Sequence, residues 1–225
     1  MNKVLVVMTN IGKYGNSDEA TGLWLGEATE FVAPLIANGY EIDYVSPLGG
    51  YVPIDPRSMK YVNHEIMTIY EQRDFQRRAL GNSMRPDQVN PLEYRAIYFT
   101  GGHGVMWDFP DNQALQDVAL AIYNNGGFVT SVCHGIAGLL GIKQADGNYL
   151  IKGKKITGFT TAEEWLAGKQ GQVPYFSADV VQERGGIFVK QRAYCSHAIQ
   201  DERLITGQNP FSVDKVAQLL LKSLK

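Results

Sequence analysis

Short apolar runs that alternate with helical patterns restrict the fold of this chain more than any other feature. Residues 4–8 (VLVVM) are continuously apolar and end in Thr9 and Asn10. Such a run is typical of a central strand in a parallel sheet, because helices cover that strand on both faces. Residues 94–100 (YRAIYFT) and 128–132 (FVTSV) predict two further strands. The sequence therefore predicts a sheet whose middle is buried on both sides.

Segments with helical spacing separate these strands. Apolar residues recur every three or four positions in residues 23–38, 112–125 and 211–225, which predicts amphipathic helices. The remaining strand-like segments are residues 41–46, 155–158, 187–192 and 204–206, and a short helix of small residues spans 136–140. Strands that alternate with helices indicate an α/β fold, with a mainly parallel sheet and helices on both faces.

The stretch between the second and third predicted strands is different in character. Residues 47–60 are rich in proline and glycine, which predicts a long loop that reaches the functional face. Residues 61–90 are polar and partly helical in pattern. The whole chain of 225 residues has the size of one α/β domain. We therefore expect a single domain over residues 1–225, with a lid or insertion in roughly 47–92.

Charge and apolar patterning exclude several classes of protein. The formal net charge is −2, which gives no basic surface for nucleic acid. No window approaches the ~20 apolar residues of a membrane span, and the first apolar run is too short for a signal peptide. The two cysteines, Cys133 and Cys195, lack the CxxC spacing of redox and metal motifs. We expect a soluble, cytoplasmic protein with reduced thiols that binds neither nucleic acid nor membranes.

Cys133 is the candidate nucleophile. It directly follows a predicted strand and precedes His134, Gly135 and a predicted helix. A sharp strand-to-helix turn of this kind lifts a nucleophile above the carboxyl edge of the sheet, as the serine elbow does. The partial positive charge at a helix start favours a thiolate, so we expect the pKa of Cys133 to be depressed. Cys195 has no such setting, and a structural role is the simpler interpretation.

Several motifs, taken in order along the chain, resemble the ThiJ/PfpI superfamily. They include T-G-G-H-G at residues 100–104, S-V-C-H-G at 131–135 and I-T-G-F-T-T-A-E-E at 156–164. Within that superfamily the chain is similar to the heat-shock-protein-31 branch, which includes the glutathione-independent glyoxalases (glyoxalase III). The resemblance implies a flavodoxin-like three-layer sandwich with a nucleophile elbow, and commonly a homodimer.

The resemblance also implies roles for single residues. The family nucleophile matches Cys133, and the triad histidine matches His134. The acidic third member matches Glu164, with Glu163 as the neighbour left open. A glutamate from the first helix, which hydrogen-bonds the cysteine, matches Glu27.

Each of these roles is physically reasonable. Burial beside a thiolate would raise the pKa of Glu27 and keep it protonated, while Glu164 would fix the tautomer of His134. The family's backbone oxyanion site matches the N–H groups of Gly102 and His134. His103 in the same glycine turn is either a pocket residue or a polar turn residue.

Cofactors and metals are not expected. The glycines at 101, 102 and 104 do not form the G-x-G-x-x-G pattern of dinucleotide sites. Some relatives bind a metal through histidines and a carboxylate, but His64, Glu65 and His197 lack a recognisable ligand spacing. We therefore predict no metal and no cofactor.

Our leading hypothesis is a hydro-lyase of the glyoxalase III type with a Cys-His-Glu triad. It would convert methylglyoxal, a small reactive aldehyde, to lactate through a hemithioacetal on Cys133. Two alternatives stay open: a stress-response holding chaperone in which Cys133 senses oxidation, and a cysteine peptidase or amidase. Glutamine hydrolysis is disfavoured, because Ile199 stands two positions after His197, where amidotransferases carry an acidic residue.

Overall fold

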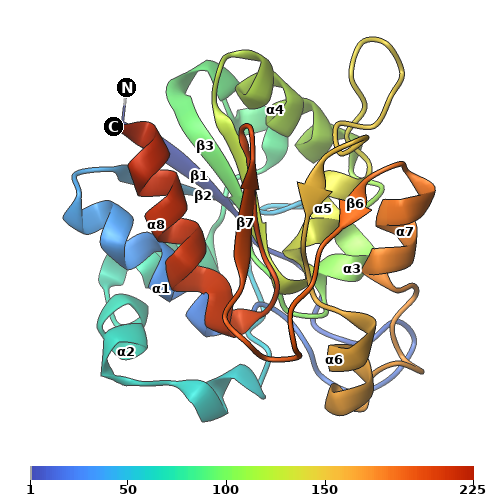
Figure 1. The fold of residues 1–225 in the computed structure, drawn as a ribbon. Coiled ribbons are helices and arrows are strands. Elements are labelled where there is room, and N and C mark those ends of the chain that lie inside the picture. Colours follow the sequence, from blue (N-terminus) through green and yellow to red (C-terminus); the bar gives the residue numbers. More distant parts are fainter. Residues whose placement is uncertain (1) are drawn as a thin grey trace.

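The computed structural model describes residues 2–225 and is built around a six-stranded sheet (Figure 1). The strand order is β2-β1-β3-β4-β8-β7, and all neighbours are parallel except β7, which is antiparallel to β8. The strands are β1 (Lys3–Val7), β2 (Glu41–Val45), β3 (Tyr94–Phe99), β4 (Phe128–Val132), β7 (Ala198–Asp201) and β8 (Leu204–Gly207).

Helices cover both faces of this sheet (Figure 1). One face packs against α1 (Leu25–Ala37) and α8 (Val213–Leu224). The other packs against α3 (Val105–Asp108), α4 (Gln113–Asn124) and α5 (Ala137–Leu140). The predicted α/β three-layer architecture with a mainly parallel sheet is confirmed.

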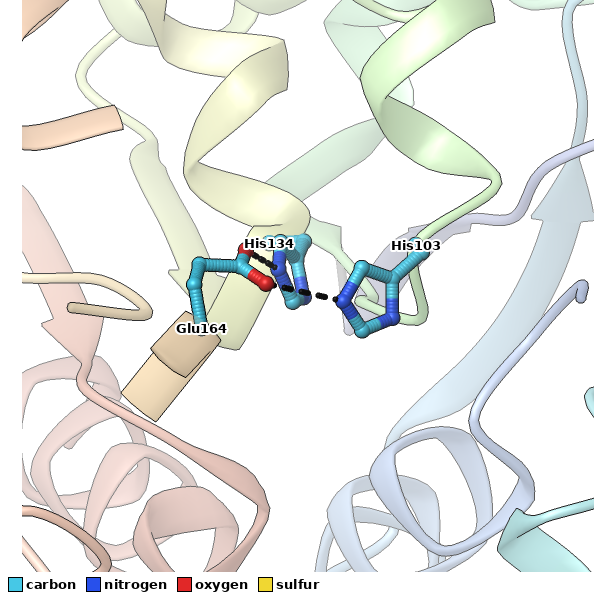
Figure 2. A group of neighbouring side chains, drawn as sticks. All are labelled: His103, His134 and Glu164. Atoms are coloured by element: carbon cyan, nitrogen blue, oxygen red, sulfur yellow. Dashed lines mark hydrogen bonds and ion pairs between the residues drawn. The ribbon is translucent and has the colours of Figure 1, made fainter. Parts of the chain in front are cut away.

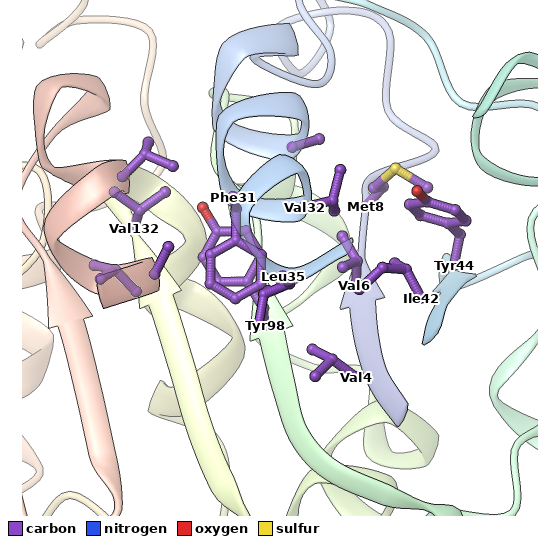
Figure 3. Packing of buried hydrophobic residues seen from close by; sticks show 14 of the residues in the cluster. Val4, Val6, Met8, Phe31, Val32, Leu35, Ile42, Tyr44, Tyr98 and Val132 are labelled. Carbon is purple, nitrogen blue, oxygen red and sulfur yellow. The ribbon is translucent and has the colours of Figure 1, made fainter. Parts of the chain in front are cut away.

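The central strand β1 shows why its sequence is apolar throughout. Val4 and Val6 point into the core under α1 and α8, while Leu5 and Val7 point into the core under α4. Successive side chains of a strand face opposite sides, so a strand between two helical layers must be apolar at every position. Figure 3 shows the first of these cores, in which the ring of Phe31 stacks on that of Tyr98 with 3.5 Å between centroids.

The other elements lie outside the main sheet. They are α2 (His64–Tyr70), α6 (Thr161–Ala167), α7 (Ser177–Glu183), β5 (Lys155–Ile156) and β6 (Ile187–Phe188), with short 3₁₀ or π turns η1 (Ser58–Tyr61), η2 (Phe75–Gly81), η3 (Pro86–Gln88), η4 (Pro91–Glu93), η5 (Cys133–Ile136) and η6 (Pro210–Ser212). The segment 47–92 therefore holds α2, three short turns and the start of η4. Its loop is tied to the chain before α1, because Asp55 N–H donates to Leu23 carbonyl at 2.9 Å.

Two strand predictions are wrong in detail. Residues 155–158 and 187–192 supply only two strand residues each, and these pair with one another in a separate small sheet. The antiparallel edge strand β7 was not expected at all. Its sequence, AIQD, is only partly buried, so it lacks the apolar run that identifies inner strands. Within residues 2–225 no helix has the length and apolar character needed to cross a membrane.

Candidate active site

Cys133 lies in a strained turn between β4 and α5. Its backbone φ is 57°, a left-handed conformation that is uncommon for residues other than glycine. Such strain is concentrated at functional sites. Gly135 makes the turn sterically feasible, because a Cβ there would lie 2.2 Å from the carbonyl oxygen of Phe99. The predicted strand-to-helix elbow is therefore present, and it is held tightly against the end of β3.

Glu27 lies beside the cysteine, in the first turn of α1, and is fully buried. Its Oε2 accepts a hydrogen bond from the backbone N–H of Gly101 at 2.6 Å. Its carboxyl lies close enough to Cys133 for each group to influence the ionisation of the other, and Oε1 has no hydrogen-bond partner among the described residues. Gly101 permits this approach, because a Cβ there would lie 2.4 Å from Oε2.

Burial governs the ionisation of both groups. It raises the pKa of Glu27 to about 8, so this carboxyl is mostly protonated at neutral pH, in the direction expected from the sequence. Burial also raises the pKa of the Cys133 thiol, and a charged Glu27 adds to the effect, while the backbone N–H of His134 opposes it. The expectation of a depressed cysteine pKa is therefore wrong. The helix start acts on the sulfur, but the loss of solvent around a thiol that is 3% exposed outweighs it.

His134 links the thiol to Glu164, and Figure 2 shows its contact with the carboxylate. Its Nδ1 lies 3.4 Å from the Cys133 sulfur, and its Nε2 lies 2.5 Å from Glu164 Oε1. Glu164 comes from the first turn of α6 and is also buried. Burial acts to raise its pKa, but the charge and hydrogen bonds of His134 and His103 hold the pKa of Glu164 well below its usual range. The carboxylate is therefore ionised and accepts hydrogen bonds only.

Glu163, the neighbour left open by the sequence, has a different environment. It is fully buried and closes a capping box with Thr160 at the start of α6. Its Oε1 accepts hydrogen bonds from Tyr194 N–H and from the side-chain amides of Gln208 and Asn209, at 2.8 to 3.0 Å. Glu163 thus joins α6 to the C-terminal segments, whereas the structure brings Glu164 to His134.

His103 reaches the same carboxylate from the glycine turn after β3 (Figure 2). Its Nε2 lies 3.1 Å from Glu164 Oε2, and its Nδ1 lies 3.1 Å from Arg57 Nη2. Gly102, one residue earlier, has a φ of 97°, and a Cβ there would lie 2.0 Å from the carbonyl oxygen of Gly22. Sequence reasoning placed both residues near the pocket but missed Arg57. No sequence signal links a loop arginine to a turn that lies 46 residues further on.

These residues open into one pocket of about 800 Å³. Cys133, His134, Gly102, His103 and Arg57 all line it. Aromatic side chains form much of the remaining wall: Trp24, Tyr61, Phe159, Tyr194 and Phe211. A volume and an apolar lining of this kind are typical of small-molecule sites with a few polar groups that fix orientation.

His103, His134 and Glu164 are also the group that could hold a metal ion, since their ligand atoms lie within 4.8 Å of one another. Two ligands of a tetrahedral zinc ion lie about 3.3 Å apart, given zinc–ligand distances of about 2.0 Å. His134 Nε2 and Glu164 Oε1 are closer than that, at 2.5 Å, which favours a hydrogen bond between them. The sequence had pointed only to His64, Glu65 and His197 as candidate ligands. The absence of a metal stays a prediction.

Comparisons with known proteins agree on one family. The family model described as DJ-1/PfpI family matches residues 26–223. The chain is 32% identical to the glutathione-independent glyoxalase HSP31 of Saccharomyces cerevisiae, over 99% of this chain and 98% of the relative. The X-ray structure of the rapid encystment protein REP24 of Francisella tularensis has a TM-score of 0.96 at 36% identity, with all of both chains covered. The crystal structure of glyoxalase III from Candida albicans has a TM-score of 0.89 at 30% identity, over 98% of this chain and 96% of that one.

Proposed function

The chain belongs to the DJ-1/PfpI family, and on that premise we propose that it is a glutathione-independent glyoxalase that converts methylglyoxal to lactate. Relatives that match over nearly the full chain are named glutathione-independent glyoxalase, glyoxalase 3 and glyoxalase III. The observation that supports it most directly is the continuous contact from the Cys133 sulfur through His134 to Glu164.

The first step is attack of the Cys133 sulfur on the aldehyde carbon. His134 Nδ1 lies 3.4 Å from the sulfur and takes the thiol proton. Glu164, held ionised, stabilises the imidazolium that forms. The oxygen that becomes negative accepts hydrogen bonds from the N–H groups of Gly102 and His134. It then takes the proton back from His134, which gives the neutral hemithioacetal and a neutral imidazole for the next step.

The second step moves a hydrogen between the two carbons. A base removes the proton from the former aldehyde carbon and returns one to the neighbouring carbonyl carbon, through an enediol. We assign this shuttle to His134 rather than Glu27, because His134 lines the pocket whereas Glu27 is buried and bonded to Gly101. The resulting thioester is hydrolysed by one water molecule, which releases lactate and the free thiol. The sum is addition of water to methylglyoxal, so no redox cofactor is needed.

The test is loss of methylglyoxal and formation of lactate by the purified protein without added thiols. Cys133→Ala should abolish turnover, and Cys195→Ala is the matched control, because Cys195 does not line the pocket. Activity that survives in Cys133→Ala would refute the mechanism. Turnover of a peptide substrate in place of methylglyoxal would favour the amidase alternative.

The size of the pocket bears on substrate range. At about 800 Å³ it is much larger than a three-carbon dicarbonyl, so we expect larger 2-oxoaldehydes such as phenylglyoxal to be accepted in the same assay. The homodimer, the cytoplasmic location and the lid in residues 47–92 stay predictions.

A further inference from the structure

The second oxygen of Glu164 leads away from the nucleophile to a chain of buried polar groups. We propose that Arg57 and His103 form a positioning arm that acts through Glu164 to fix His134 in the tautomer that can accept the thiol proton. The value of this arm to the reaction rests on the proposed function, but its geometry does not.

Two groups in this chain of contacts can act in only one way: the Arg57 guanidinium only donates, and the ionised Glu164 carboxylate only accepts. Arg57 has only N–H donors, so His103 Nδ1, 3.1 Å from its Nη2, must be the acceptor. The proton of the neutral imidazole is then on Nε2, which donates to Glu164 Oε2 at 3.1 Å. Glu164 is thereby occupied on that side by a donor and presents only Oε1 to His134.

The Glu164 carboxylate also fixes the tautomer of His134. His134 Nε2 must donate to Glu164 Oε1, so in the neutral ring Nδ1 carries the lone pair. That lone pair faces the Cys133 sulfur at 3.4 Å. The ionised carboxylate thus leaves Nδ1 of His134 free to take the thiol proton, and the arm that ends in Arg57 holds this carboxylate in the orientation that meets His134 Nε2.

Arg57 is itself held rigidly. Asp55 is fully buried and accepts from Arg57 Nε at 3.0 Å and Nη2 at 2.6 Å, and from the hydroxyl of Thr21 at 3.0 Å. The guanidinium also lies over the ring of Tyr14, 5.2 Å from its centroid. A bidentate pair of this kind fixes orientation as well as charge.

The arm also keeps His103 neutral. Its ring centroid lies 4.1 Å from that of His134, so a charged His103 would repel the imidazolium that His134 becomes. The groups that face His103 are Glu164, His134, Arg57 and the ring of Tyr14. Burial, His134 and Arg57 outweigh Glu164 and lower the pKa of His103 to about 4.

The experiment compares histidine nitrogen NMR spectra and pH–rate profiles of wild type, Arg57→Met and Arg57→Lys. The chain has four histidines, so each tautomer can be assigned by single replacements. In wild type we expect His103 as the Nε2–H tautomer from pH 5 to 8. In Arg57→Met, His103 loses the donor that occupies Nδ1, so we expect this nitrogen to be protonated at a higher pH than in wild type and kcat to fall roughly tenfold, with little change in KM. Arg57→Lys, which keeps a donor, should restore part of kcat.

Arg85→Met is the matched control, because Arg85 also pairs with an aspartate two residues away but lies outside the pocket. It should leave the spectra of His103 and His134 unchanged. A wild-type His103 that carries its proton on Nδ1, or an Arg57→Met variant whose His103 and His134 spectra match those of wild type at every pH, would overturn the inference whatever the substrate is. An absence of glyoxalase activity with the expected tautomers would instead count against the proposed function alone.

Discussion

Replacement of Glu164 by glutamine tests the tautomer chain most sharply. The carboxylate accepts an N–H from each of two imidazoles, at 2.5 Å and 3.1 Å. A glutamine offers one acceptor and one donor group, so only one histidine can keep its present tautomer. Arg57 holds His103 as an acceptor at Nδ1 and prevents it from changing. We therefore expect His134 to change, which puts its proton on Nδ1, toward the Cys133 sulfur.

The size of the effect follows from the lost base. General base catalysis typically contributes 10²- to 10⁴-fold in rate, and each tenfold is about 1.4 kcal/mol in activation free energy. Glu164→Gln should thus lose about 3–5 kcal/mol of transition-state stabilisation, seen in kcat for lactate formation. If the glutamine instead turned its NH₂ group toward His103, that group would face the Nε2–H of His103. Two donors would then meet, and the buried N–H left unpaired would cost about 1–3 kcal/mol.

A second replacement makes the prediction specific. In the double variant Glu164→Gln with Arg57→Met, His103 is free to change its tautomer instead of His134. The double variant should therefore turn over faster than Glu164→Gln alone, even though each single change lowers kcat. The assay is steady-state kinetics on variants whose folding has been checked by thermal denaturation. A Glu164→Gln variant within threefold of wild type, or a double variant slower than it, would refute the tautomer logic.

Three further predictions concern stability. The pKa of Glu27 rises from 4.5 to about 8 on folding. As the pH rises between those values, wild type should therefore lose roughly 1.4 kcal/mol of unfolding free energy per pH unit relative to Glu27→Gln. Urea titrations of both proteins from pH 5 to 9 measure this, and a constant difference in their unfolding free energies would exclude it. Glu163→Gln puts an amide where buried donors converge and should lower stability by about 1–3 kcal/mol, yet reduce kcat far less than Glu164→Gln does. Gly135→Ala should destabilise the fold by about 3 kcal/mol or more, because its Cβ meets backbone oxygens. Gly171→Ala, where a Cβ meets nothing within 4 Å, should be nearly neutral in the same thermal melts.

Features that depend on residues close in sequence could be predicted from the sequence. The apolar run of β1 reveals a strand buried on both faces, and the β4–Cys133–Gly135 sequence predicts the elbow. The family resemblance directed attention to Glu27 and Glu164, and the structure places both beside the Cys133–His134 pair. The resemblance pointed to Glu164 but left Glu163 open, because adjacent carboxylates differ only in the side of the helix they occupy.

Other properties depend on which distant segments meet. Periodicity and motif order determine the layers of the fold and the position of the nucleophile, because a local sequence limits which backbone conformations and which buried faces are available. Only the tertiary structure places Arg57 and Asp55 behind His103, and only it encloses Cys133 so fully that burial reverses the expected direction of its pKa. Desolvation and hydrogen-bond partners are properties of the assembled surroundings, since water is excluded and donors converge only when segments far apart in the chain pack together.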